Sequence, residues 1–245
     1  MQGQNQQQAY DRGITIFSPD GRLYQVEYAR EAVERGSASV GVRTAEGVVL
    51  VADRQRRSPL IERDSIEKIH AVDDHVAVAS AGHVADARRL VDVARRQAQV
   101  ERLRYDQPIG VETLTKHVTD HIQEYTQTGG ARPFGVALLV AGVADGEPRL
   151  FETDPSGTPY EWQATAIGGD YDDALEYLEE TYREDVDLDG GVALALEALA
   201  ETTDAVTAET VEVSVIDAED AAVRTLDADE VGTHLAESDV GGERE

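Results

Sequence analysis

The order of strand-like and helix-like segments along this 245-residue chain constrains its fold most. Short apolar or alternating runs come in pairs joined by turn residues, which is typical of antiparallel hairpins. Two pairs of longer amphipathic runs interrupt them, so the order is strands, two helices, strands, two helices, strands. We therefore predict an α+β fold, a four-layer α/β/β/α sandwich of two antiparallel sheets. The expected strands are 39–42, 47–53, 66–72, 75–81, 134–143, 148–153, 160–167, 210–216 and 222–226, and the expected helices are 84–103, 111–127, 170–184, 192–203 and 228–237.

Composition supports a packed protein of the cytoplasm. Hydrophobic residues make up 41% of the chain, enough to bury a core, and no internal linker is evident. Cysteine is absent, which excludes disulfides and thiolate metal sites and fits a cytoplasmic location. No run is long and apolar enough to span a membrane, and the start of the chain lacks the apolar segment of a secretory signal.

The net charge of −27 comes from 49 acidic residues against 22 basic ones, of which only Lys68 and Lys116 are lysines. An acidic partner-binding surface and disorder are two interpretations of this excess. We favour adaptation to molar salt, where the Debye length falls to about 3 Å, because the acids are spread over nearly every predicted helix. The charge argues against nucleic-acid binding by the bulk surface.

The two ends of the chain differ from its middle. Residues 1–9 form a polar, Gln-rich tail without an apolar face, and residues 238–245 form an acidic, Gly-rich tail that we expect to be disordered. Between them we expect one domain over residues 10–237. A turn at 18–21 precedes a helix over 21–35, which presents Leu23, Val26 and Val33 on one face and stops at Gly36.

The stretch 10–33 resembles the signature of proteasome core-particle (20S) α subunits of the archaeal type. Segments farther along, including ADARRLVD, YTQTGGARPFGV, RLFETDPSGT and ATAIGGD, are similar to the same family. The signature match runs through Tyr10, Thr15, Phe17, Ser18, Pro19, Gly21, Arg22, Gln25, Val26, Glu27, Tyr28, Ala29 and Ala32.

The resemblance implies the fold of N-terminal nucleophile hydrolases in a subunit that is itself not catalytic and needs no cofactor. It implies a ring with six further α subunits, stacked on β subunits that carry the catalytic threonines. It also implies that the ring gates the entry of unfolded protein substrates and docks a regulatory AAA ATPase.

The resemblance also carries functional residues over to this chain. The first nine residues would occlude the pore, and the loop 129–132 would form an inner constriction. Thr128 stands just before this loop, where the family favours an aromatic residue, so the resemblance does not fix the width of the constriction. The gate residues would be Tyr10, Asp11, Pro19 and Tyr28, and the constriction residues Gly129, Gly130, Ala131 and Arg132.

Lys68 would line a pocket between neighbouring α subunits, with Arg30 and Gly82 nearby. The pocket would receive the C-terminal tail of the ATPase, whose carboxylate would pair with the ammonium group. Residues 81–83 depart from the family pattern, so the resemblance does not fix the shape of the pocket. A solvated ion pair of Lys68 with Glu62 or Glu67 is the alternative interpretation.

A hydrolase hypothesis rests on Ser37. It lies where the sister β subunits expose a nucleophile by cutting after a Gly, and Asp53 and Lys68 fall close to the acid and the lysine of those enzymes. An internal Ser37 has only an amide nitrogen, which is no base, so we favour an intact bond between Gly36 and Ser37.

Two patterns resemble parts of metal sites. Asp185, Asp187 and Asp189 resemble the start of a calcium loop, but Leu196 stands at the twelfth position, where a bidentate Glu is needed. We therefore favour an acidic turn between helices over a calcium-binding module. His117 and His121 lie four residues apart, as two zinc ligands on one helix face would. The residues between them, 118–120, do not include the catalytic Glu of the metalloprotease motif, so no metal site is predicted.

Overall fold

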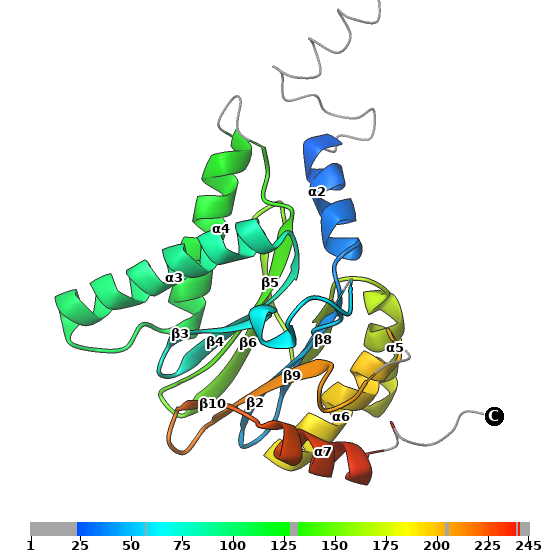
Figure 1. Ribbon diagram of the computed structural model, residues 1–245. Helices are drawn as coiled ribbons and strands as arrows, with labels where there is room; N and C mark the ends of the chain where they lie inside the picture. Colours follow the sequence, from blue (N-terminus) through cyan, green and yellow to red (C-terminus); the bar gives the residue numbers. More distant parts are fainter. Residues whose placement is uncertain (1–23, 57, 128–131, 204–205, 239, 241–245) are drawn as a thin grey trace, which may run out of the picture.

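The computed structural model describes residues 24–56, 58–127, 132–203, 206–238 and 240. Two five-stranded antiparallel sheets lie face to face (Figure 1). The first has the order β10-β9-β2-β1-β8, with β1 Ser39–Arg43, β2 Gly47–Asp53, β8 Ala164–Ile167, β9 Val211–Asp217 and β10 Val223–Thr225. The second has the order β3-β4-β5-β6-β7, with β3 Ile69–Asp73, β4 Val76–Gly82, β5 Val136–Ala144, β6 Glu147–Thr153 and β7 Pro159–Glu161.

Helices cover both outer faces and one end of this pair of sheets. The second sheet is covered by α3 (Val84–Tyr105) and α4 (Val111–Gln127), and the first by α5 (Tyr171–Thr181), α6 (Leu188–Ala200) and α7 (Ala228–Glu237). Helix α2 (Tyr24–Glu34) stands over one end of the strands (Figure 1). The predicted four-layer α/β/β/α sandwich is confirmed.

The layers form because the central strands are apolar on both faces. On β5, Val136, Leu138 and Val140 pack against α3 and α4, whereas Leu139 and Val143 pack between the sheets. Side chains of a strand alternate between the two faces of a sheet, so a continuous apolar run fills two cores at once.

Helix boundaries follow their capping residues. Asp227 caps α7, where its side chain accepts hydrogen bonds from the backbone N–H groups of Asp229 and Glu230 in a capping box. Asp187 caps α6 by accepting from the backbone N–H of Gly190 at 2.8 Å, so α6 begins at Leu188 and not at the predicted residue 192.

The single strand predicted over 160–167 is wrong. The chain crosses from one sheet to the other there, because the Trp162 N–H donates to Leu150 O at 2.9 Å in the second sheet. One residue later, the Gln163 carbonyl accepts from the Arg43 N–H at 2.8 Å in the first sheet. The run therefore gives two short edge strands, β7 and β8, in different sheets.

Helix α2 is seated by packing and by a close backbone contact at its C-terminal end. Val26, Ala29 and Val33 are buried. A Cβ atom added to Gly36 would lie 2.4 Å from the backbone nitrogen of Gly82, which itself has φ +112°. Side chains are excluded from both positions, so the end of α2 rests directly on the end of β4.

No helix in the described ranges is both long and apolar enough to cross a membrane.

Candidate functional site

Lys68 lies just before β3 and points into the protein below the end of α2. Only 8% of the residue is exposed. Its Nζ donates to the carbonyl oxygen and to the Oγ of Ser37, each at 3.0 Å, and its backbone N–H donates to Glu212 Oε2 at 2.9 Å. The ammonium group is therefore held at the joint between α2 and β1.

Burial controls the electrostatics of this cluster. Loss of solvation lowers the pKa of Lys68 to about 8, although the charges of Asp53 and Glu212 act in the opposite direction. Burial also raises the pKa of both carboxyl groups. No carboxylate lies within ion-pair distance of the ammonium among the residues that the structure describes, so Lys68 is a buried cation without a salt bridge.

The structure brings together the three residues of the hydrolase hypothesis. Ser37 Oγ donates to the backbone carbonyl of Asp53 at 2.8 Å and accepts from the Lys68 ammonium. The carbonyl of Gly36 accepts from the Gly169 N–H at 2.8 Å. Ser37 follows α2 as an internal residue, so its nitrogen is an amide and cannot act as a base. A nucleophile-like constellation is thus present without the free amine that activates it.

Arg30 and Gly82 lie at different distances from this cluster. Gly82 touches Gly36, which neighbours Ser37. Arg30 instead ties α2 to the second sheet, because its guanidinium donates to Asp154 at 2.9 Å and to Glu27 at 2.8 Å. Arg30 and Lys68 therefore bind different partners, Arg30 on the second sheet and Lys68 at Ser37.

Most of the predicted gate and constriction residues lie outside the described residues: Tyr10, Asp11, Pro19, Gly129, Gly130 and Ala131. Tyr28 is 66% exposed on α2. Arg132 donates to both carboxylate oxygens of Asp86, at 2.6 and 2.8 Å. Burial opposes ionisation of Asp86, but the hydrogen bonds from Arg132 and Gly135 outweigh it and lower the pKa of this carboxyl. The base of the loop is therefore fixed to the start of α3.

The alternative metal sites are occupied by other contacts. Asp187 is the cap of α6. The His117 ring contacts Gln97, whereas the His121 ring packs against Tyr125 and Phe134. Within the described ranges no group of three or more His, Asp or Glu side chains is placed to hold a metal ion.

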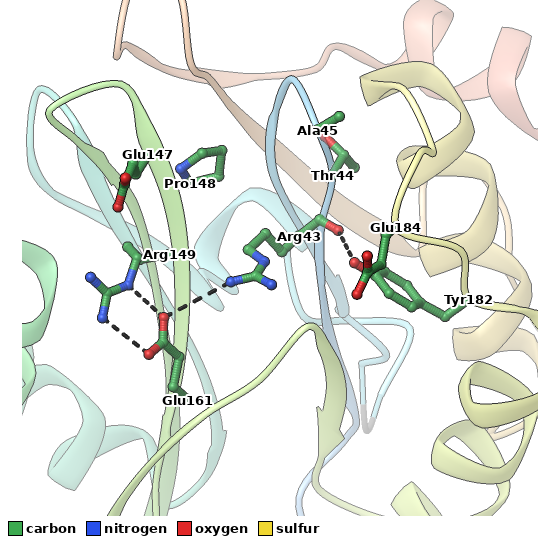
Figure 2. Close-up of a pocket in the computed structure, with 9 residues that line it drawn as sticks. All are labelled: Arg43, Thr44, Ala45, Glu147, Pro148, Arg149, Glu161, Tyr182 and Glu184. Atoms are coloured by element: carbon green, nitrogen blue, oxygen red, sulfur yellow. Dashed lines mark hydrogen bonds and ion pairs between the residues drawn. The ribbon is translucent and has the colours of Figure 1, made fainter.

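A polar hollow of about 500 Å³ opens beside the β1–β2 turn, near the start of β6 (Figure 2). Arg149 and Glu161 pair side by side on the neighbouring strands β6 and β7, with Nη2 of Arg149 3.0 Å from Glu161 Oε2. Arg43 approaches the same carboxylate from the other side, at 4.0 Å. The hydroxyl of Tyr182 donates to the Arg43 carbonyl. Arg149 and Arg43 share the Glu161 carboxylate, so the charges of this hollow largely satisfy one another, in contrast to the Lys68 ammonium.

We expect Lys68 to make stability depend on alkaline pH. Because its pKa is about 8 in the folded protein and 10.5 ordinarily, the unfolded chain binds more protons between these values, and stability rises with pH there. The free energy of unfolding relative to Lys68→Met should rise by about 3 kcal/mol across that window. Denaturant titrations in high salt at about pH 7, 8, 9 and 10 measure it.

Lys116→Met is the matched control for this titration. Lys116 is exposed on α4 and pairs with Glu112, so its removal should leave the slope of stability against pH unchanged. Equal slopes for the wild type and Lys68→Met would contradict the burial of a titrating ammonium.

Sequence reasoning missed Glu212 and Asp154 as partners of the site. Glu212 did carry a signal, because strand alternation places it on the same face of β9 as Ser214 and Ile216, between the sheets. Asp154 lies in an ordinary turn and carried none.

Comparison with known proteins gives matches over most of the chain. The family model described as "Proteasome subunit" matches residues 33–216, and the model of the N-terminal signature of A-type proteasome subunits matches residues 10–32. The chain is 69% identical over 244 residues to the alpha 2 proteasome subunit of Haloarcula marismortui, a match that covers 99% of this chain and 100% of that protein. It is 66% identical over 242 residues to the alpha proteasome subunit of Natronomonas pharaonis, covering 98% and 95%.

Haloarcula marismortui also has an alpha 1 proteasome subunit, which is 66% identical to this chain over 241 residues, covering 98% of this chain and 93% of that protein. Paired alpha 1 and alpha 2 names imply a multi-subunit complex. These relatives come from halophilic archaea, in agreement with the acidic composition. The chain belongs to the proteasome α-subunit family, whose members are in general non-catalytic parts of the 20S core.

Proposed function

We propose that the chain assembles with six further α subunits into the outer ring of a cytoplasmic 20S proteasome, stacked on a ring of catalytic β subunits. The ring would gate the entry of unfolded proteins. Family membership supports the proposal, and a head-to-tail contact repeated about an axis closes such a ring. Residues 10–237 would form the body of the subunit, and the loop 129–132 would narrow the channel behind the gate.

The observation that carries the docking role is the buried, unpaired ammonium group of Lys68. A cation in a low-dielectric site attracts a single anionic group strongly, and the chain supplies no carboxylate to pair with it in the described residues. The C-terminal carboxylate of an ATPase tail fits that requirement. Its entry beside Ser37 would press on the joint between α2 and β1, which connects to the gate segment through α2.

Residues 1–9 lie outside the described residues, and we predict that they occlude the pore. Deleting residues 2–9 should speed the degradation of an unfolded protein by the assembled particle several-fold, because a polar tail fills space only at an entropic cost. Cleavage of short peptides by the β subunits should change little. Degradation of casein and of a fluorogenic peptide, measured on the same particles, tests this.

The control is a deletion of residues 238–245, which removes the same number of residues from the other end of the chain. It should leave both activities unchanged. Equal rates of protein degradation with and without residues 2–9 would count against the gate.

Ser37 supports a second candidate, a self-processed N-terminal nucleophile hydrolase. The Lys68 ammonium at 3.0 Å from Ser37 Oγ favours it, as does the Gly169 N–H on the Gly36 carbonyl. We favour the α-subunit role because Lys68 is predominantly charged at neutral pH and donates to the hydroxyl instead of removing its proton. Intact mass separates the two, since a chain that begins at Ser37 would establish self-processing.

A further inference from the structure

The loop between β2 and β3 exposes a hydrophobic side chain on an otherwise polar surface. Leu60 is 91% exposed and Ile61 is 36% exposed. The loop also holds the short turn η1 (Arg63–Ser65), which Figure 1 shows in cyan between strands β3 and β9. We call residues 58–61 the knob. A single exposed Leu is common on protein surfaces. An exposed Leu on a loop that is already held in one shape beside a sheet edge indicates a contact surface.

The knob is held in shape by its own hydrogen bonds. The Arg56 guanidinium donates to the carbonyls of Pro59 and Ile61, at 3.1 and 3.2 Å, and the Ile61 N–H donates to the carbonyl of Ser58 at 3.1 Å. An ion pair of Arg63 with Glu209 at 3.2 Å fixes the loop to the segment before β9. A pre-ordered loop loses little conformational entropy on binding.

The charge of this loop opposes that of the whole chain. Residues 54–66 contain four Arg against two acidic residues, whereas the chain carries a net charge of −27. Within the described residues Arg56 is bonded only to backbone carbonyls, so its positive charge is not cancelled by a carboxylate. An acidic surface is therefore the complementary partner.

The opposite edge of the sandwich offers such a surface. Strands β3 and β7 are the two edges of the second sheet, so the loop that carries the knob leads into the edge opposite β7. Tyr160 on β7 is 53% exposed. On β6 and β7, Glu147, Glu152 and Glu161 stand against Arg149. Arg149 pairs with Glu161, so Glu147 and Glu152 give this edge its excess of acid. One edge thus presents a basic, apolar knob and the other an aromatic ring beside an excess of two acidic side chains.

We propose that the knob of one copy packs against the β7 edge of a second copy of this chain, with Leu60 against Tyr160. The inference rests on the proposed ring, for which it supplies the head-to-tail contact. Two different surfaces on opposite edges form a heterologous contact, which generates a ring when the rotation closes. In molar salt charge attraction is screened, so the apolar contact carries most of the affinity and the charges set the orientation.

The test uses Leu60→Asp, Tyr160→Asp and the control Leu103→Asp in the purified full chain at high salt. All three side chains are exposed, Leu103 by 87% on α3, so the variants should fold like the wild type. We expect wild type and Leu103→Asp to form rings in analytical ultracentrifugation. We expect Leu60→Asp and Tyr160→Asp to need at least about tenfold higher concentration to assemble, and to sediment as monomers at the concentration where the control is a ring.

Mixing the two disrupted variants tests the direction of the contact. Leu60→Asp retains an intact β7 edge and Tyr160→Asp retains an intact knob, so one good contact can form between them. The mixture should give a one-to-one dimer and no ring, whereas each variant alone stays monomeric.

Two outcomes would overturn the inference while leaving the ring itself intact: a ring formed by Leu60→Asp, or a ring formed by Tyr160→Asp. A mixture without a dimer would also overturn it, because the two edges would then not face each other. A wild-type chain that stays monomeric in molar salt would instead overturn the proposed ring. The two proposals therefore fail in distinguishable ways.

Discussion

Lys68→Ala particles are expected to lose ATPase-stimulated degradation while they keep their rings and their peptidase activity. Removing one partner of a buried charge pair costs about 2–5 kcal/mol, which corresponds to at least about thirtyfold weaker tail binding. The ammonium lies beside Ser37 without a carboxylate partner in the described residues, so an incoming tail would lose its principal cationic contact.

The measurement compares two particles and two activities. In full-length particles, degradation of an unfolded protein is followed with and without a peptide that carries the ATPase tail. In particles that lack residues 2–9, peptide cleavage should be unaffected by Lys68→Ala, because the proposed gate segment has been removed. Lys116→Ala is the matched control, since Lys116 is the other lysine and pairs with Glu112 on the exposed face of α4.

If the tail peptide stimulates protein degradation by Lys68→Ala particles as strongly as by the wild type, the docking role of Lys68 is wrong. Lys68 would then be a structural cation that holds the α2–β1 joint, and the tail would bind elsewhere. Lower thermal stability of the variant together with an unchanged response would point to the same conclusion.

The assembled ring is expected to require high ionic strength. Each chain carries −27, and this charge would be repeated around the proposed ring. At about 0.1 M salt the Debye length is about 10 Å, long enough for carboxylates on adjacent subunits to repel one another, whereas at about 1 M it falls to about 3 Å. Size-exclusion profiles across a salt series should therefore shift from ring to monomer as salt is removed.

Sucrose provides the control for this salt series. It is excluded from protein surfaces and favours compact states, but it does not screen charge. Rings that dissociate in dilute buffer should stay dissociated when sucrose replaces the salt. Rings that remain intact in dilute buffer would show that repulsion between acidic surfaces does not limit assembly.

The layers and several element boundaries could be predicted from the sequence where the hydrophobic pattern of neighbouring residues matches the burial seen in the structure. The bounds of β2, α4 and α7 match the prediction, because an apolar run, an amphipathic period and the Asp227 capping box each act over neighbouring residues. The crossing at Trp162 and Gln163 was not predictable. Two short edge strands in different sheets show the same local alternation as one long strand, and only distant hydrogen-bond partners separate them.

The contacts around Lys68 were not predictable from the sequence, and its docking role stays a prediction. Position in the family pattern singled out Lys68, yet a surface ion pair with a neighbouring Glu was the simpler interpretation of the residues around it. The structure instead buries the ammonium and bonds its backbone N–H to Glu212, 144 residues later in the chain. Contacts of that separation depend on how the two sheets stack, which no local window contains.

The joint between α2 and β1 has a mechanical consequence. Gly36 rests on Gly82 and bonds to Gly169, while Ser37 is held by Lys68 and by the carbonyl of Asp53. A helix gripped this firmly at its base behaves as a stiff lever. The eleven residues of α2 extend about 16 Å from that fulcrum, so a tilt of about 10° at the joint would sweep the far end by about 3 Å. Such a tilt would also have to shift the buried Val26 and the ion pair of Arg30 with Asp154, so these contacts would limit the sweep.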